Sequence, residues 1–414
     1  RLTNTTAFVT SAVYTVSTVA GACASTFTLT VTLNPAAQPS NFSTTTCTGT
    51  PFNVTATAGI VPANTSYSWG IPQMSSGITL GVAGSGNSIS GTLTNSTNLT
   101  RTAVYSVNTI TGSCVGTSFS LTVHVDPRPS INSFVANPVC SGAPFVITPT
   151  SGTIIPTGTR YVWNSVPVVT NNAITNGQTQ VSPGSLNIYG ALSNTTSIQQ
   201  TATYTITPSF AACTGSSFVF TITINPTPVV SNLTRVICSG EPVTITPVEG
   251  THGSIIPLNT LYAWNSGTVT PNNSVIGNNS SGYVSAFSTT LSLISADITT
   301  RNVRFAVTPR STIGSLNCSG NPFSITITVN PRAIITAMST FACSGEPFVL
   351  TPTNSTNGTV PANTTYTWEM PSYGAGVSGG SSQTNPSSNI FGTLTVDGNS
   401  TQTAVYTVIP NTTN

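Results

Sequence analysis

Charged side chains are scarce throughout this chain. Only 4% of its 414 residues are Asp, Glu, Lys or Arg, whereas an average globular protein carries about 25%. The nine basic residues are scattered and form no cluster of the kind that binds nucleic acid. No apolar run is long enough to cross a bilayer. The sequence therefore predicts no nucleic-acid partner and no membrane span in this segment.

Groups for acid–base or metal chemistry are equally few. Histidine occurs twice, at His124 and His252, and neither position recurs elsewhere in the repeat described below. Catalytic triads, carboxylate pairs and calcium sites need several such groups in one place, and no Cys-x-x-Cys pair suggests zinc. We therefore expect no catalytic site, no metal, no cofactor and no enzyme. The seven acidic residues are dispersed along the chain: Asp126, Glu241, Glu249, Asp297, Glu346, Glu369 and Asp397.

Strand-forming and turn-forming residues take the place of the charges. Hydrophobic residues make up 38% of the chain, so it is not disorder-prone by composition. Apolar and polar residues alternate over 218–225, where Phe218, Phe220, Ile222 and Ile224 face one side of a predicted strand. No stretch shows a 3.6-residue period. The sequence predicts an all-β protein.

A repeated motif organises the whole chain. All four tryptophans end a Pro-x-(Asn/Gly)-Thr-x-Tyr-x-Trp segment, at steps of 94, 101 and 104 residues. A later strand carries an aromatic residue in each copy, with Tyr14 as an extra one. In an immunoglobulin-like sandwich such positions lie in the core. The predicted core residues are Trp69, Trp163, Trp264, Trp368, Tyr105, Tyr204, Phe305 and Tyr406.

Cysteine occurs at two positions of the repeat. One type begins the motif Cys-(Ser/Thr)-Gly-x-Pro, and we name these the motif cysteines: Cys47, Cys140, Cys238 and Cys343. The other type precedes an alternating strand that ends at Asn-Pro or Asp-Pro, and we name these the strand cysteines: Cys23, Cys114, Cys213 and Cys318. Regular cysteines of this kind favour disulfides in an oxidising compartment.

Several short strands per repeat, with turn residues between them, indicate a tandem array of immunoglobulin-like β-sandwich domains. Boundaries are expected at the Pro pairs, because proline stops strand pairing and stiffens a linker. Since 2–14 align without gaps on 93–105, we expect the chain to be a window on a longer array. The expected segments are 1–34, the C-terminal part of a preceding repeat; 35–126, 127–225 and 226–330, three repeats; and 331–414, a repeat truncated before its last strand.

The Cys-Ser-Gly-x-Pro-Phe motif, the Tyr-x-Trp strand and the Thr-Val-Asn-Pro ending together resemble PKD-like repeats. Such repeats occur in giant surface proteins of Bacteroidetes-type bacteria, including gliding-motility adhesins exported by the type IX secretion system. The resemblance covers essentially the whole chain. It implies PKD-like β-sandwiches and a role at the bacterial cell surface.

Three disulfide schemes respect the repeat. Within a repeat the pairs are Cys47–Cys114, Cys140–Cys213 and Cys238–Cys318; across a linker they are Cys114–Cys140 and Cys213–Cys238; across a junction of consecutive repeats they are Cys47–Cys213 and Cys140–Cys318.

Geometry favours the junction scheme. In a seven-strand sandwich the two cysteine types lie at opposite ends, about 20–30 Å apart, whereas a disulfide needs Cα atoms within about 7 Å. In a head-to-tail array, the exit end of one repeat faces the entrance end of the next. Partners of the other four cysteines would then lie outside this window. If the first or last strand is offset, the within-repeat scheme remains open.

The function that these observations favour is a structural or adhesive extracellular fibre or stalk. Its expected partners are neighbouring repeats, other copies of the fibre, and surface polysaccharide or a host surface. Two alternatives remain, a spacer or carbohydrate-binding region of a secreted enzyme, and a filament subunit that donates a strand. Asn-x-Ser/Thr triplets occur at Asn64, Asn95, Asn194 and Asn363, although most such triplets arise by chance in a chain this rich in Asn, Ser and Thr.

Overall fold

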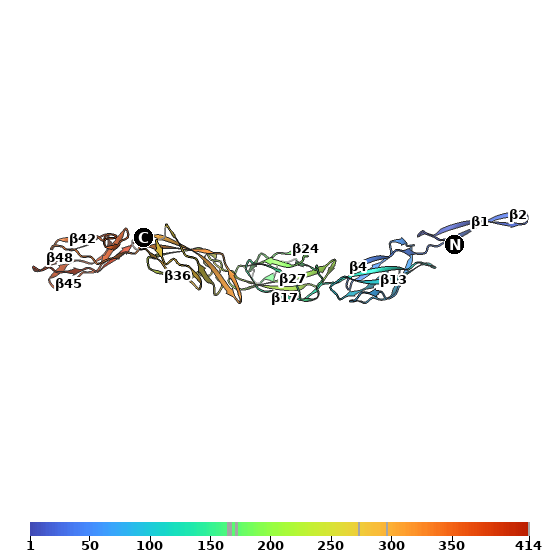
Figure 1. Ribbon diagram of the computed structural model, residues 1–414, viewed down its shortest axis with the longest axis horizontal. Coiled ribbons are helices and arrows are strands. Elements are labelled where there is room, and N and C mark those ends of the chain that lie inside the picture. Colours follow the sequence, from blue (N-terminus) through green and yellow to red (C-terminus); the bar gives the residue numbers. More distant parts are fainter. Residues whose placement is uncertain (164–167, 170–172, 272–273, 295–296, 413–414) are drawn as a thin grey trace. The chain divides into compact units, whose positions relative to one another are not determined.

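The computed structural model describes residues 1–163, 168–169, 173–271, 274–294 and 297–412 (Figure 1). Its regular structure is almost entirely β, as the alternating pattern predicted, with one turn of 3-10 helix at Thr251–Gly253. The chain divides into two compact units, of which the first comprises 1–137, 143–192 and 201–223 and the second 138–142, 193–200 and 224–414. No helix in the described part of the chain is both long and apolar enough to span a bilayer.

The first repeat contains one large sheet and several two-stranded sheets, among them β5 (Pro51–Val54) with β11 (Ile89–Thr92). In the large sheet the strand order is β4, β15, β13, β7 and β10. The first strand in the sequence, β4, runs parallel to the last strand, β15. β15 runs antiparallel to β13, the strand that comes before it in the repeat. The tryptophan strand, β7, lies next to β13 on the side away from β15. The main strands are β4 (Phe42–Cys47), β5 (Pro51–Val54), β7 (Thr65–Trp69), β10 (Gly84–Gly86), β11 (Ile89–Thr92), β13 (Arg101–Thr111), β14 (Cys114–Val115) and β15 (Phe119–Asp126).

The second and third repeats have the same sheet order. In the third, β30, β40, β38, β32 and β35 follow one another across the sheet. The second repeat's main strands are β17 (Phe134–Val135), β18 (Val139–Cys140), β19 (Pro144–Ile147), β21 (Arg160–Trp163), β24 (Gln180–Ser185), β25 (Ile188–Ala191), β27 (Gln200–Phe210), β28 (Cys213–Thr214) and β29 (Phe218–Asn225). The third repeat's are β30 (Leu233–Cys238), β31 (Pro242–Ile245), β32 (Leu261–Trp264), β33 (Thr268–Thr270), β35 (Ser281–Val284), β36 (Phe287–Thr290), β38 (Arg301–Ile313), β39 (Leu316–Ser319) and β40 (Phe323–Asn330).

In the first three repeats the strand cysteine does not lie on the long last strand itself. In all three repeats a short piece at the cysteine, β14, β28 or β39, is separated from the long last strand. A glycine lies at or just after the end of each short piece, at Gly116, Gly215 or Gly320. A β-carbon built at any of these glycines would meet a backbone carbonyl oxygen within 2.3 Å. The strand is therefore interrupted where another backbone segment passes so close that only glycine fits.

The core of each complete repeat lies between the large sheet and the smaller strand pairs. Alternate residues of the last strands are completely buried, which is the outcome of period-two patterning. Ile89, Leu93 and Leu121 are fully buried in the first repeat, and Phe305, Ile325 and Ile327 in the third.

Residues before the first repeat and after the third form incomplete sets of strands. β1 (Thr10–Ala20) and β2 (Cys23–Leu33) pair antiparallel as a hairpin. The last segment keeps its tryptophan strand but has no strand equivalent to β15, β29 or β40 among its described residues. Its main strands are β42 (Pro347–Leu350), β44 (Thr364–Trp368), β45 (Ser372–Tyr373), β46 (Val377–Gly379), β47 (Gln383–Ser387), β48 (Ile390–Val396), β49 (Ala404–Val405) and β50 (Val408–Thr412).

Candidate functional site: the disulfide-linked junctions between repeats

In the first three repeats the motif cysteine lies where its repeat ends and the linker begins. The first strand runs parallel to the last, so its final residue is opposite the residue that precedes the linker proline. Cys47 is paired with Asp126, and Cys140 with Asn225. This register holds the motif cysteine beside the start of the next repeat.

The hairpin that carries the strand cysteine approaches the same linker. A β-carbon at Gly215 would lie 2.0 Å from the carbonyl oxygen of Pro129, and one at Gly320 would lie 2.0 Å from that of Pro228. In the first repeat, the backbone N–H of Thr117 donates a 2.9 Å hydrogen bond to the carbonyl oxygen of Ala37. Glycine therefore lets the linker backbone seat against the hairpin of the repeat it enters.

These two placements bring one cysteine of each type together. Cys47 bonds to Cys213 and Cys140 bonds to Cys318, with Cα atoms 5.5 Å apart in both disulfides. These are the junction pairs, and neither other scheme occurs among the described residues. Each disulfide has both of its cysteines in one compact unit, the first for Cys47–Cys213 and the second for Cys140–Cys318. The remaining cysteines are free thiols: Cys23, Cys238 and Cys343 are exposed, and Cys114 is half-buried.

Hydrogen bonds surround the first disulfide. Arg128, between the two linker prolines, donates from Nε to the carbonyl oxygen of Thr48 at 3.1 Å and from Nη2 to Oγ1 of Thr50 at 2.9 Å. Its Nη1 donates to the carbonyl oxygen of Thr214 at 2.6 Å. One side chain thus joins the turn after the motif cysteine to the hairpin of the following repeat. No sequence motif pointed to Arg128, although an arginine also follows the linker proline at Arg332.

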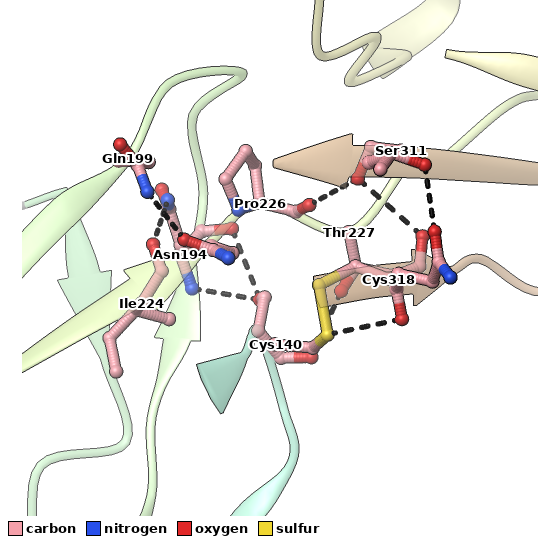
Figure 2. Close-up of a disulfide and its surroundings, with 12 residues drawn as sticks. Cys140, Asn194, Gln199, Ile224, Pro226, Thr227, Ser311 and Cys318 are labelled. Atoms are coloured by element: carbon pink, nitrogen blue, oxygen red, sulfur yellow. Dashed lines mark hydrogen bonds between the residues drawn. A yellow bond between two sulfur atoms is a disulfide. The ribbon is translucent and has the colours of Figure 1, made fainter. Parts of the chain in front are cut away.

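Figure 2 shows the second disulfide with the linker running beside it. Oγ1 of Thr227 donates to the carbonyl oxygen of Ser141 at 3.2 Å, as Arg128 does at the equivalent carbonyl of Thr48. The buried hydroxyl of Ser311 donates to the carbonyl oxygen of Pro226 at 2.9 Å. Side chains therefore satisfy a turn carbonyl at both junctions, and at the second junction a linker carbonyl as well.

Two of the Asn-x-Thr triplets have a structural role near these junctions. Asn194 is buried, and its Nδ2 donates to the carbonyl oxygens of Ile198 and Ile224 (Figure 2). Its Oδ1 accepts hydrogen bonds from the backbone N–H and the hydroxyl of Thr196. Asn95 makes the same set with Leu99, Val125 and Thr97. By contrast, Asn64 and Asn363 are exposed turn residues with positive φ.

In the third repeat an aspartate occupies the equivalent position. Burial opposes ionisation of Asp297, but hydrogen bonds from Arg301 and Thr299 outweigh it and hold the pKa of this carboxyl below its usual range. The Asp297–Arg301 ion pair is 2.8 Å long. Within the described residues no group of three His, Cys, Asp or Glu side chains could hold a metal ion. His124 is half-buried on β15, and His252 is exposed in the 3-10 turn.

The structure buries the tryptophans of all four motif copies. Their exposed fractions are 7% for Trp69, 2% for Trp163, 6% for Trp264 and 3% for Trp368. The indole nitrogens of Trp163, Trp264 and Trp368 donate to backbone carbonyls. These rings therefore pack in the cores and offer no stacking platform to a sugar.

The aromatic residues of the next-to-last strand are equally buried in three repeats. Tyr105, Tyr204 and Phe305 are at most 2% exposed, while Tyr406 is half-buried. Burial raises the pKa of Tyr204 to about 12, and that of Tyr262 likewise to about 12.

Comparison with solved structures finds an adhesin, an insect immune protein and a segment of titin. The Escherichia coli adhesin FdeC matches with 12% identity and a TM-score of 0.29, over 63% of this chain and 85% of that one. The insect immune protein hemolin matches with 14% identity and a TM-score of 0.25, over 84% and 90%. Titin domains I67–I69 match with 12% identity and a TM-score of 0.26, over 71% and 96%. All three TM-scores lie below 0.5, so the family assignment does not depend on them. No curated protein matches this chain.

Comparison with protein families finds the PKD-like domain in three tandem copies, at residues 44–129, 137–228 and 235–333. Each matched copy includes one motif cysteine, one tryptophan and one strand cysteine. The matches cover more than half of the chain, which therefore belongs to the PKD-like domain family.

Proposed function

We propose that this chain is a load-bearing and adhesive segment of an extracellular fibre or stalk, which projects from or links a bacterial cell surface and is not catalytic. The observation that carries the proposal is the covalent joint between consecutive repeats, Cys47–Cys213 and Cys140–Cys318. A spacer of independent domains needs no such joint. Disulfides form and persist outside the reducing cytosol, which supports an extracellular place.

The two disulfides interlock along the chain. Their cysteines occur in the order Cys47, Cys140, Cys213 and Cys318, so each disulfide closes a loop that contains one end of the other. If the repeats unfold under tension, the shortest covalent route from Cys47 to Cys318 passes through the 73 residues between Cys140 and Cys213 rather than 271 residues. At about 3.3–3.6 Å per residue, the two disulfides together shorten the fully extended chain by roughly 650–710 Å.

The proposed partners follow from the role as a load-bearing, adhesive fibre. Each repeat binds its neighbouring repeats in the chain, and the fibre binds other copies of itself, surface polysaccharide or a host surface. The resemblance to surface adhesins of Bacteroidetes-type bacteria supports a place in surface attachment or gliding. A carbohydrate-binding role finds no support at the tryptophans, because their rings are buried.

Single-molecule stretching of the full chain tests this function. The chain is pulled from its ends with and without a thiol reductant, and the gain in contour length on complete unfolding is measured. The proposal expects a gain that is roughly 650–710 Å shorter without reductant. Equal gains in both conditions would mean that the repeats extend independently, and the load-bearing role would be abandoned. The double variant Cys23→Ser, Cys114→Ser keeps both joints and serves as the control.

A further inference from the structure

An exposed apolar patch lies on the first repeat, along the edge of its large sheet that ends at β10. The loop before β8 (Gln73–Met74) and the loop after β9 (Ile78–Thr79) both contribute to it. A β-carbon at Gly81 would lie 2.7 Å from Cγ of Pro72, so the two loops lie against each other. We name this surface the Leu80 patch; its members, with exposed fractions of 73%, 39%, 63% and 58%, are Ile71, Met74, Leu80 and Val82.

Leu80 has a backbone conformation that the other copies of the repeat give to glycine or asparagine. It follows β9, and its equivalents are Asn176 after β23 (Ile174–Thr175), Gly277 after β34 (Val275–Ile276) and Gly379 at the end of β46. All four residues have positive φ, of 68°, 64°, 90° and 88° in chain order. A leucine in this region is strained by its β-carbon, whereas glycine and asparagine tolerate it. The fold itself therefore favours a residue other than leucine at this position.

The same loop withholds a hydrogen bond that tryptophan makes in the other copies. The indole nitrogen of Trp368 donates to the carbonyl oxygen of Ser381, and the tryptophans of the second and third repeats make the same kind of bond. Val82 stands at the same distance along the chain from Trp69 as Ser381 does from Trp368. Yet the buried indole nitrogen of Trp69 has no partner among the described residues, which costs stability. The loop thus exposes apolar side chains although neither its backbone nor the tryptophan gains from its conformation.

The first repeat has almost no charge with which to recognise a partner. Over 35–126 its only Asp, Glu, Lys or Arg residues are Arg101, which is half-buried, and Asp126, which is buried. Amides and hydroxyls both donate and accept hydrogen bonds, so a rim made of them is complementary to a copy of itself, whereas a rim of like charges is not. The exposed polar side chains beside the patch are of this kind: Gln73, Ser76 and Thr79.

The patch is apart from both linkers of the first repeat. Met74 is paired with Ala103, whereas the hairpin that contacts the entering linker begins at Thr111, towards the other end of β13. The leaving linker follows β15, which pairs with the opposite edge of β13. The segments on either side of this repeat therefore attach away from the patch.

We propose that the Leu80 patch is a lateral contact between two copies of this chain, in which the patch of one copy packs on the same patch of the other about a two-fold axis. The inference specifies how other copies of the fibre are bound, and so rests on the proposed function. Burial of the apolar side chains supplies the attraction. Four side chains are far fewer than the roughly 20–30 residues per partner of a standard interface. A single contact is therefore weak, and it acts where copies of the fibre lie side by side.

Sedimentation velocity of the full chain over a series of concentrations tests the proposal. Leu80→Asn introduces the residue that the second repeat has at this position, and Val82→Ser introduces the residue that the last segment has. Both remove apolar surface in favour of side chains that the fold already accepts. Leu258→Asn, at an 84% exposed leucine in a loop of the third repeat, is the matched control. All chains keep both joints and lack free thiols, because they carry Cys23→Ser, Cys114→Ser, Cys238→Ser and Cys343→Ser.

The expected result is an average mass that rises with concentration towards twice that of one chain in the parent and in Leu258→Asn. In Leu80→Asn and Val82→Ser the mass should stay that of one chain over the same range. Leu80→Asn should melt no lower than the parent in dilute solution, because asparagine relieves the strained backbone.

Three outcomes overturn the proposal. One is a parent that stays monomeric throughout, and another is equal behaviour of Leu80→Asn and Leu258→Asn. The third is a lower melting temperature in Leu80→Asn, which would assign Leu80 to the fold rather than to a contact. The stretching experiment is made on single chains, so its result is independent of a contact between copies and each proposal can fail without the other.

Discussion

Nη1 of Arg128 donates a 2.6 Å hydrogen bond to the carbonyl oxygen of Thr214, 86 residues further along the chain. The same guanidinium holds Thr48 and Thr50, so it joins the end of one repeat to the hairpin of the next. A planar group with five donors can bind three acceptors in different directions, which lysine cannot do in the same way. The junction therefore depends on the shape of this side chain as well as its charge.

Arg128→Met is expected to loosen the first junction. It removes three hydrogen bonds at an exposed site and lowers the free energy of unfolding by about 1–2 kcal/mol. Thermal unfolding and protease cleavage in the linker at 127–129 measure the effect. Arg235→Met, at an exposed arginine of the third repeat, is the matched control and should leave both unchanged. Equal behaviour of the two variants would show that the Arg128 contacts carry no stability.

Loss of a joint is expected to destabilise the repeats that it links. Cys47→Ser opens a disulfide with a sequence separation of 166, and removal of disulfides that close long loops typically costs about 2–5 kcal/mol. Urea unfolding of the oxidised chain measures the change. Cys343→Ser removes a free exposed thiol and should have no effect. The prediction fails if both substitutions shift the urea midpoint alike.

Gly215→Ala is expected to keep the hairpin from seating on the linker. The added methyl group meets the Pro129 carbonyl oxygen at 2.0 Å, and overpacking of this kind typically costs about 1–3 kcal/mol. Quantification of free thiols during oxidative refolding should show slower formation of Cys47–Cys213. Gly282→Ala, where an added β-carbon meets nothing within 4 Å, is the control. Unchanged kinetics in Gly215→Ala would exclude a role for the close approach.

Asn194→Ala is expected to destabilise the second repeat by about 2–4 kcal/mol, because it leaves two backbone carbonyls without a donor. Hydrogen exchange of the strands around Ile224 reports the change. Asn385→Ala, at an exposed asparagine, is the matched control. In a host that glycosylates asparagine, Asn95 and Asn194 should stay unmodified, because their amide nitrogens are occupied. A glycan at either residue would contradict the hydrogen bonds described above.

Alkaline pH is expected to unfold the second repeat through Tyr204. Its pKa is raised from 10.0 to about 12 in the folded chain, so above pH 10 the unfolded state binds fewer protons than the folded state. The stability is complete below pH 10 and is lost as the pH rises to about 12. Tyrosinate absorbance and circular dichroism follow the transition. Tyr204→Phe, which mimics Phe305 of the third repeat, should remove this part of the pH dependence. A persistent dependence would assign it to other groups.

The sequence by itself determined the strands, the repeat and the two types of cysteine. Period-two alternation over 218–225 and proline at the linkers act locally, so they are visible in one dimension. The burial of Trp163 and Tyr204 follows from the same local pattern, because alternate side chains of a sandwich strand face the core. Scarcity of charge is likewise a property of the composition, and it limits the chemistry that the side chains can perform.

The tertiary structure decided which cysteines meet and which polar groups are occupied. Strand order in a sandwich places residues together that are far apart in sequence, so the spacing of Cys47, Cys114 and Cys213 left several pairings open. Parallel pairing of the first and last strands, and glycine at the hairpin, bring Cys213 to Cys47 rather than Cys114. The same three-dimensional placement buries Asn194 and gives Arg128 its acceptors, and neither contact leaves a periodic signal in the sequence.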